Sequence, residues 1–344
     1  MILVFNGDNR LKVQNLPPIE ILNLGDLKED RKAIIFTDKI VWEKIAPYVR
    51  FKQKDIIYVE RPTETYLSSL VNSLGNYEVV YGIGGGVAND VAKFIGFYKK
   101  VETVSIPTIF STDAFLTSEV GVRVRDEIKY FPAKHPDIVY VDLDVISKAP
   151  KRLNFCGCGD ILSIYTGLFD WKYTNIKGKI AEDEKLSLHV YYLSQAILRS
   201  LEVQKDEIRI CSKEGLKAIL DLLCMEVQLC YLYGNSRPEE GSEHYFTYLI
   251  ENITKKHFLH GEMVALGTLI MSYFQGQDYK YIKNLMDYIG LNYLGTGATR
   301  DEIIRTIQEL PNYVKEKKLR YSYAHDLIFD LEKVNFILKD IGIA

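Results

Sequence analysis

Short runs of apolar and β-branched residues alternate with helical patterns over the first 150 residues, and this alternation limits the possible folds more than any other feature. The runs predict strands at Ala33 to Phe36, Asp55 to Val59, Glu78 to Gly82, Val101 to Ile106 and Asp137 to Asp142. Such alternation predicts a parallel sheet with helices on both faces, which binds ligands at the carboxyl ends of its strands. We also interpret the apolar start of the chain, Met1 to Arg10, as a strand.

After Pro150 the hydrophobic period becomes that of amphipathic helices. The predicted helices are Glu182 to Leu201, Lys213 to Tyr233, His260 to Phe274 and Thr299 to Lys317. A chain of 344 residues exceeds the length at which one hydrophobic core usually stops growing. We therefore predict an α/β domain at 1–150 and an all-α domain at 151–344, with a ligand site in the cleft between them.

The composition excludes several classes of function. There are 43 basic and 46 acidic residues, a net charge of −3, which offers no basic surface for nucleic acid. No stretch approaches the roughly 18 apolar residues that span a bilayer, and the N-terminus lacks the parts of a signal peptide. The five cysteines have no paired metal-binding spacing, so we expect reduced thiols and a cytoplasmic location.

A run of glycines follows the predicted strand Glu78 to Gly82. Gly84, Gly85 and Gly86 stand between this strand and a helical pattern. Consecutive glycines let the backbone approach a diphosphate closely, and the start of the next helix favours its negative charge. The segment predicts a Rossmann-like nucleotide-binding domain, although Val87 stands where the usual fingerprint has its third glycine. The alternative is a tight turn without a ligand.

Two more predicted strands end in polar residues. Asp38 can accept hydrogen bonds from an adenosine ribose and repel a 2′-phosphate, which favours NAD over NADP; alternatively it caps the helix that begins near Ile40. Thr108, Ser111 and Asp113 lie in a hydroxyl-rich loop after Val101 to Ile106. The hydroxyls can bind a nicotinamide or a phosphate, and Asp113 can bind a substrate hydroxyl. Alternatively, the side chains of the loop hydrogen-bond to its own backbone.

Three segments of the helical half carry metal-ligand residue types. Asp160 is predicted at the opening of a helix, His244 early in a second helical stretch and His260 at the start of a third. One carboxylate and two imidazoles from three elements make a three-ligand site that leaves coordination positions for water or substrate. The sequence spacing alone does not bring His244 and His260 together.

Together these segments resemble the iron-containing alcohol dehydrogenase and dehydroquinate synthase-like superfamily, from about Ala33 to about Phe274. The stretches similar to glycerol dehydrogenases are Ile106-Pro107-Thr108, Ser111-Thr112-Asp113-Ala114 and His135-Pro136-Asp137. Those similar to sn-glycerol-1-phosphate dehydrogenases are Cys156-Gly157-Cys158-Gly159-Asp160, Asp170-Trp171, Ser236-Arg237-Pro238, Gly241-Ser242-Glu243-His244 and His260-Gly261-Glu262. We give the second group more weight, because its motifs are longer and compositionally unusual.

The resemblance assigns roles to individual residues. It implies metal ligands at Asp160, His244 and His260; pyrophosphate contacts at Gly84, Gly85, Gly86 and Asp90; nicotinamide contacts at Thr108, Ser111 and Thr117; and a substrate contact at Asp113. The related enzymes commonly have a substrate-contacting histidine where this chain has Tyr248. We expect Tyr248 to hydrogen-bond the substrate as a neutral donor, with Asp113 and Asp160 as the other catalytic residues. Arg237 or the segment near Arg123 would meet a phosphate; alternatively, that segment is a solvated surface hairpin.

The implied function is a metal-dependent NAD(P)(H) oxidoreductase that interconverts dihydroxyacetone phosphate and sn-glycerol 1-phosphate in phospholipid metabolism, as a homodimer or other homo-oligomer. Zinc suits the ligand set, and iron or nickel would also fit; the ion acts as a Lewis acid. Glu239 and Glu240 replace small residues of the related enzymes, which suits the alternative of a glycerol or polyol dehydrogenase. A sugar-phosphate cyclase is a second alternative. A non-catalytic nucleotide-binding module would lack part of the ligand set, and here it is complete.

Overall fold

A computed structural model describes residues 15–125 and 127–343, so the strand predicted at Met1 to Arg10 lies outside the described part. The described chain divides into two compact units. The sheet unit contains Leu16–Asn154 and Cys211–Leu220, and the helical unit contains Phe155–Ile210 and the residues from Asp221 onward. The prediction placed one boundary at residue 150; Cys211–Leu220, much later in the sequence, also belongs to the sheet unit.

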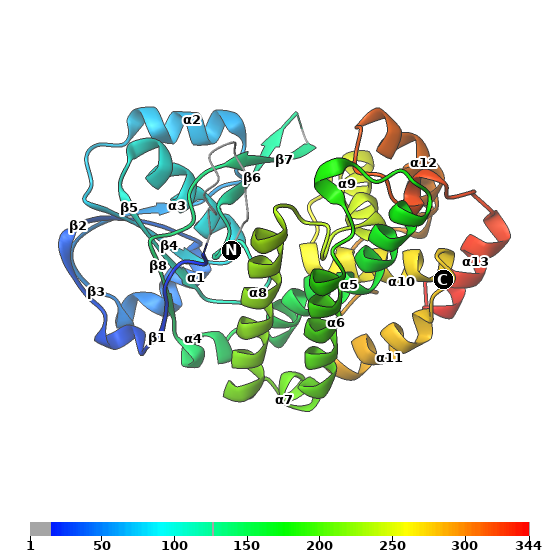
Figure 1. Cartoon of the computed structure of the whole chain (residues 1–344). Helices are drawn as coiled ribbons and strands as arrows, with labels where there is room; N and C mark the ends of the chain where they lie inside the picture. Colours follow the sequence, from blue (N-terminus) through cyan, green and yellow to red (C-terminus); the bar gives the residue numbers. More distant parts are fainter. Residues whose placement is uncertain (1–14, 126, 344) are drawn as a thin grey trace. The chain divides into compact units, whose positions relative to one another are not determined.

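The sheet unit is built on six parallel strands in the order β1-β8-β5-β4-β2-β3 (Figure 1). The strands are β1 (Ile19–Ile21), β2 (Lys28–Thr37), β3 (Arg50–Tyr58), β4 (Val79–Gly84), β5 (Glu102–Pro107) and β8 (Ile138–Val141). All five strands predicted within this unit are present. The sequence did not predict β1, because three residues are too short to show a period.

Alternating side chains of the strands build two hydrophobic cores. On one face Ile35 and Tyr81 join Trp42 and Ile45 of α1 (Lys39–Ile45). Ile34 and Val80, which point the other way, pack with residues of α2 (Glu64–Ser73) and α3 (Gly86–Lys99). Both faces are thus buried, as the apolar runs of the strands require. An antiparallel hairpin of β6 (Glu119–Val124) and β7 (Glu127–Pro132) and the short helix α4 (Leu143–Ser147) complete the unit.

The helical unit contains helices and 3₁₀ turns and no strand among its described residues. Its helices are α5 (Lys151–Ile176), which begins in the sheet unit, α6 (Leu188–Val203), α7 (Lys205–Ile210), the later part of α8 (Lys213–Tyr233), α9 (Ser242–Thr254), α10 (His260–Phe274), α11 (Tyr279–Ile289), α12 (Arg300–Glu316) and α13 (Leu331–Asp340). Helices α8 and α10 have the predicted bounds. No helix in the described ranges is long and apolar enough to cross a membrane. This architecture of a parallel sheet and a helical region confirms the predicted fold class.

Two predicted helix starts are wrong. Asp160 does not open a helix, because α5 begins directly after Pro150 and Asp160 lies more than two turns inside it. The glycines before Asp160 suggested a break in the helix, but a glycine is tolerated inside a helix where another backbone packs closely. The helix predicted from Glu182 begins only at Leu188, after a 3₁₀ turn at Glu182–Glu184.

Candidate metal centre and nucleotide-binding turn

Three helices of the helical unit bring the predicted metal ligands together. Asp160 lies on α5, His244 on α9 and His260 at the start of α10, and one ligand atom from each lies within 4.8 Å of the other two. His260 Nε2 is 3.5 Å from Asp160 Oδ1, and the two imidazole centroids are 5.4 Å apart. Ligand atoms at about 2.0–2.2 Å from one tetrahedral ion lie roughly 3.4 Å apart, so the geometry fits a divalent ion.

Glycines in α5 and α10 set the spacing of these ligands. A Cβ at Gly261 would lie 1.8 Å from the backbone oxygen of Cys156, and one at Gly159 would lie 2.0 Å from the oxygen of Gly261. Farther along α10, a Cβ at Gly267 would lie 2.7 Å from the oxygen of Glu243 on α9. Helix α10 therefore touches both neighbouring helices backbone to backbone, directly beside the ligands Asp160 and His260.

Glu243 orients the imidazole of His244. The Nδ1 of His244 lies 2.9 Å from Glu243 Oε1, which also accepts a hydrogen bond of 2.6 Å from the backbone amide of Gly241. A carboxylate oxygen only accepts, so Nδ1 carries a proton and Nε2 is the nitrogen that would bind a metal in place of its own proton. No role was predicted for Glu243, although its position next to a predicted ligand was a usable signal.

The charges around the triad favour a cation. Burial alone would lower the pKa of His244, but the hydrogen bond and charge of Glu243, together with Glu240 and Asp160, raise this pKa to about 9. Burial and the positive His244 lower the pKa of His260 to about 4. The carboxylates that attract a proton to His244 would equally attract a metal ion, because both are positive charges in a buried site.

Tyr248 lies one helical turn after His244, as predicted, and the two ring centroids are 6.1 Å apart. Its hydroxyl donates a hydrogen bond of 3.0 Å to Glu240 Oε1. In this structure the proton of Tyr248 is thus directed at Glu240, and the predicted contact of Tyr248 with the substrate stays a prediction. The sequence motif could not show this, since the turn before α9 brings Glu240 back to the helix.

Two of the cations predicted to meet a phosphate, Arg237 and Arg123, are buried. Arg237 is fully buried, and its guanidinium donates to Glu184 Oε2 at 2.6 and 3.1 Å and to the backbone oxygen of Tyr321 at 2.7 Å. An arginine paired in this way is neutralised within the helical unit. In the sheet unit, Arg123 lies on the hairpin strand β6 and is only 5% exposed.

The three predicted nucleotide-binding segments meet at one edge of the sheet. The glycine turn follows β4, the hydroxyl loop follows β5 and Asp38 follows β2, and β4 pairs with both β5 and β2. Gly84 pairs with Pro107, and Thr37 with Ile83, so the segments leave adjacent strands at similar heights. This is the carboxyl edge at which parallel sheets bind nucleotides.

The glycine turn is packed closely against the hydroxyl loop. Gly84 has a φ of +155°, which disfavours a side chain; Gly85 is the N-cap of α3, and Gly86 is its first residue. A Cβ at Gly86 would lie 3.1 Å from Thr112 Oγ1, and one at Gly85 would lie 4.0 Å from Ser111 Oγ. Ser111 thus lies beside the predicted pyrophosphate position. The amide of Thr108 donates to Gly84 O at 3.1 Å, which ties the loop to the turn.

Asp90, Thr117 and Asp113 surround the buried Lys93. The Lys93 ammonium is 3.0 Å from Asp90 Oδ1, and it donates to Thr117 O at 3.0 Å and to Thr117 Oγ1 at 3.2 Å. Asp90 also accepts from the amide of Gly121 at 3.1 Å. Burial raises the pKa of Asp113, and the charge of Lys93 opposes the rise. These contacts give Asp90 and Thr117 internal partners, and their predicted contacts with the cofactor stay predictions.

Asp38 caps α1, as the alternative interpretation proposed. Its Oδ1 accepts from the amides of Ile40 at 2.7 Å and Val41 at 3.3 Å. The side chain is exposed at the carboxyl end of β2. A cap of this kind does not prevent contact with a ribose, so the predicted preference for NAD remains untested.

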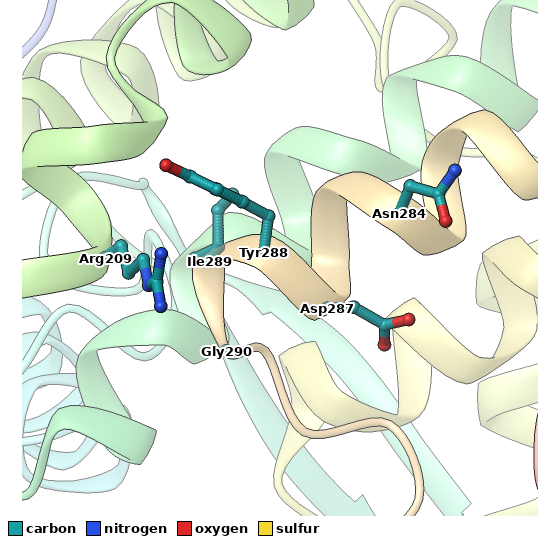
Figure 2. Close-up of a pocket in the computed structure, with 6 residues that line it drawn as sticks. All are labelled: Arg209, Asn284, Asp287, Tyr288, Ile289 and Gly290. Carbon is teal, nitrogen blue, oxygen red and sulfur yellow. The ribbon is translucent and has the colours of Figure 1, made fainter.

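A separate open depression of about 630 Å³ in the helical unit is lined by none of the predicted residues (Figure 2). Arg209 and Tyr288 face each other across its rim, with the guanidinium carbon 4.9 Å from the ring centroid. The Tyr288 hydroxyl donates to Asp206, and Lys205 also lies over the ring, at 5.1 Å. Arg209, Lys205 and Asp206 thus all pair with Tyr288.

Comparison with known proteins agrees with the geometry. The sequence profile of the iron-containing alcohol dehydrogenase family matches residues 20–150. A glycerol-1-phosphate dehydrogenase (NAD(P)+) of Aeropyrum pernix is 33% identical over 238 residues, which are 67% of this chain and 65% of that protein. The protein of the same name from Pyrococcus horikoshii is 32% identical over 258 residues, 74% of this chain and 70% of the relative.

Solved structures share the fold at lower identity. A probable glycerol dehydrogenase from Sinorhizobium meliloti 1021 has a TM-score of 0.68 and 17% identity, covering 95% of this chain and 97% of that one. The 2-epi-5-epi-valiolone synthase ValA from Streptomyces hygroscopicus, with NAD+ and Zn2+ bound, has a TM-score of 0.64 and 16% identity, covering 97% and 98%. At these identities the likeness concerns the fold alone.

Proposed function

The chain belongs to the iron-containing alcohol dehydrogenase family, in its glycerol-1-phosphate dehydrogenase branch, and on this premise we propose that it interconverts dihydroxyacetone phosphate and sn-glycerol 1-phosphate. The membership confirms the family predicted from the motifs, whose members are NAD(P)-dependent oxidoreductases. The match covers 65% of the length of the Aeropyrum relative. The activity and the substrate are therefore our proposal for this chain.

The observation that carries the proposal is the convergence of Asp160, His244 and His260 within 4.8 Å, from three different helices. In this reading the three side chains hold one divalent ion, and Glu243 keeps His244 Nε2 directed at it. Such an ion would polarise the carbonyl that receives the hydride from NAD(P)H. We propose zinc, which suits one carboxylate and two imidazoles, with iron or nickel as alternatives.

The sheet unit would hold the cofactor. The backbone of Gly84 to Gly86 and the amino end of α3 offer an anion-binding turn for the pyrophosphate. Ser111 lies beside this turn and Thr108 is tied to it, which supports their predicted contacts with the nicotinamide half of the cofactor. A homodimer, a cytoplasmic location and a role in phospholipid metabolism are further proposals that rest on the family resemblance.

The direct test is reduction of dihydroxyacetone phosphate by the metal-loaded protein, followed as oxidation of NADH and of NADPH, with dihydroxyacetone as the competing substrate. We expect steady cofactor oxidation and a higher kcat/KM for the phosphorylated ketone. A failure to oxidise either cofactor with dihydroxyacetone phosphate would contradict the proposal. Product formation without net change in the cofactor would indicate a cyclase instead.

A polyol dehydrogenase is the second candidate, and one observation favours it. Arg237, the cation expected to meet a phosphate, is bound to Glu184, whereas the carboxylate of Glu240 lies beside Tyr248 near the triad. A negative charge there suits an uncharged polyol. A higher kcat/KM for dihydroxyacetone than for its phosphate would establish this candidate.

A further inference from the structure

The helix that carries His244 is capped by a residue of another helix. The N-cap position of α9 is Gly241, which has no side chain to accept from the first amides. Instead, Asp170 of α5 accepts a hydrogen bond of 2.6 Å from the amide of Ser242, the first residue of α9. Asp170 is fully buried, so its carboxylate serves a helix amide that water does not reach. A residue of α5 thus fixes where α9 begins.

Close packing at Gly241 strengthens this attachment. A Cβ at Gly241 would lie 2.5 Å from Asp170 Oδ2 and 3.0 Å from the Cα of Gly167, which also lies on α5. A side chain at this position would push the start of α9 away from α5 and from the Asp170 carboxylate. The hydrogen bond to Asp170 and the backbone contact with Gly167 therefore hold the same point of α9.

The turn that Asp170 holds also orients the metal ligand. The amide of Gly241 donates to Glu243 Oε1 at 2.6 Å, and the same oxygen lies 2.9 Å from His244 Nδ1. The carboxylate that directs the imidazole is thus bound to the backbone next to Ser242. A shift of Ser242 away from Asp170 would move Glu243 and His244 with it, because they are the next two residues of the helix.

The second oxygen of Asp170 binds a segment near the end of the chain. Asp170 Oδ1 accepts a hydrogen bond of 2.6 Å from the amide of Tyr323, which begins the 3₁₀ turn η4 (Tyr323–His325). The next amide of this turn, that of Ala324, donates to Ser242 Oγ at 3.0 Å. The ring of Tyr323 meets the ring of Tyr173 on α5 edge to face, with 5.5 Å between the centroids. One buried carboxylate therefore joins α5, the start of α9 and η4.

We propose that Asp170 is a positioning residue of the metal centre, which acts on His244 through the first turn of α9. Both of its oxygens bind backbone amides, so Asp170 is a structural anchor and not a fourth ligand. Asp170 shares α5 with the ligand Asp160, and its bond to Ser242 therefore sets the position of His244 relative to Asp160. The stretch Asp170-Trp171 is one of the motifs that carry the family resemblance, and this assigns it a role.

The inference rests on the proposed metal centre and deepens it. Metal sites tolerate deviations of only about 0.2 Å in ligand distance. A small shift of the start of α9 is therefore enough to weaken the site, even though every ligand is still present. Loss of contacts that support a ligand typically lowers metal affinity by about 10–100-fold.

Titration of the apo protein with Zn2+ and with Co2+ tests the inference. Asp170→Ala removes both acceptors, and we expect the dissociation constant for Zn2+ to rise about tenfold. The visible absorption bands of bound Co2+ depend on the coordination geometry, so they should change in position or intensity. Asp170→Asn keeps one acceptor oxygen and should show a smaller change of the same kind. If Asp170→Ala does not fold, Asp170→Asn decides the question.

Thr174→Val is the matched control. Thr174 lies one turn after Asp170 on α5, is fully buried and donates a hydrogen bond of 2.7 Å to the backbone oxygen of Tyr321. Valine has nearly the same shape and loses this bond to the same late segment of the chain, while the bond from Asp170 to α9 stays. Chemical unfolding of the apo proteins should show reduced stability in Thr174→Val and in both Asp170 variants. Only the Asp170 variants should change the Zn2+ affinity and the Co2+ spectrum.

The outcomes separate the anchor from the metal centre itself. If the wild type binds Zn2+ and the Asp170 variants keep its affinity and its Co2+ spectrum, the inference is overturned and the metal centre stands. Equal losses of metal affinity in Thr174→Val and Asp170→Asn would also overturn it, because reduced stability alone would then explain them. If the wild type binds neither ion, the metal centre and the inference are both overturned.

Discussion

Replacement of Gly261 by alanine should loosen the metal centre without removing a ligand. The new Cβ would lie 1.8 Å from the backbone oxygen of Cys156 and 2.5 Å from its carbonyl carbon, whereas real Cβ atoms essentially never come closer than 3.0 Å. Both contacts are with backbone, so no side chain can rotate away. Helices α5 and α10 must therefore separate by about 1 Å, as overpacked cores do when they relax.

The separation acts directly on the ligands. His260 precedes Gly261, and its Nε2 is now 3.5 Å from Asp160 Oδ1. Metal sites tolerate deviations of only about 0.2 Å in ligand distance. We expect the metal dissociation constant to rise at least tenfold, comparable with the roughly 10–100-fold losses that follow disturbance of a metal site's supporting contacts. The apo protein should lose about 1–3 kcal/mol of unfolding free energy.

The assay is metal titration of the apo protein, together with chemical unfolding with and without metal. Gly75→Ala is the control, because a Cβ at Gly75 would meet nothing within 4 Å. Gly159→Ala should behave like Gly261→Ala, since its Cβ would lie 2.0 Å from the oxygen of Gly261. A Gly261→Ala protein with wild-type metal affinity and wild-type stability would refute the view that this backbone contact sets the ligand spacing.

Four further predictions follow from the same structure. His260→Ala should lose its bound metal and its turnover while circular dichroism shows an intact fold; stoichiometric metal in this variant would exclude His260 as a ligand. Glu243→Gln should weaken metal binding by about 10–100-fold in a competition titration, because the imidazole of the neighbouring ligand loses its charged partner. Unchanged metal affinity would mean that Glu243 only stabilises the start of its helix. Asp38→Ala should reduce the preference for NAD over NADP, measured as the ratio of kcat/KM. If the wild type prefers NADPH, Asp38 only caps its helix and does not select the cofactor. Burial raises the pKa of Glu29, but hydrogen bonds from Arg31 and Tyr81 outweigh it and lower this pKa to about 2. The ionised Glu29 should therefore stabilise the fold by up to about 3 kcal/mol, fully above pH 4.5 and less and less as the pH falls towards 2. Equal pH dependence of unfolding in Glu29→Gln and the wild type would contradict this.

The sheet unit was predictable because its signals are local. Ala33 to Phe36 and Glu78 to Gly82 are apolar runs that only a strand buried on both faces requires, and both are strands of the observed sheet. The glycine turn and the hydroxyl loop follow such strands directly, so their meeting at one edge of the sheet follows from parallel pairing. Strand β1 has only three residues, and its pattern did not distinguish strand from loop.

In the helical unit, contacts between residues far apart in the sequence determine side-chain partners that the sequence alone did not predict. Arg237 looked like a cation available to a phosphate, but Glu184, which lies on a separate 3₁₀ turn, neutralises it. The partner of Tyr248 depends on a turn that returns Glu240 to α9. Asp160 appeared to open a helix because the adjacent glycine resembles a helix break, whereas the structure uses that glycine for contact with α10.

The same contact explains why the metal ligands could be recognised although their spacing in the sequence is uninformative. Asp160 directly follows Gly159, and His260 directly precedes Gly261. In each motif a ligand residue adjoins a glycine. The ligand supplies the donor atom, and the glycine permits the close backbone contact that positions this ligand. Any side chain at either glycine would separate the two helices, so the glycine is as necessary to the site as the ligand beside it. The short motifs therefore specify the distance between helices α5 and α10, and through that distance they specify the metal centre.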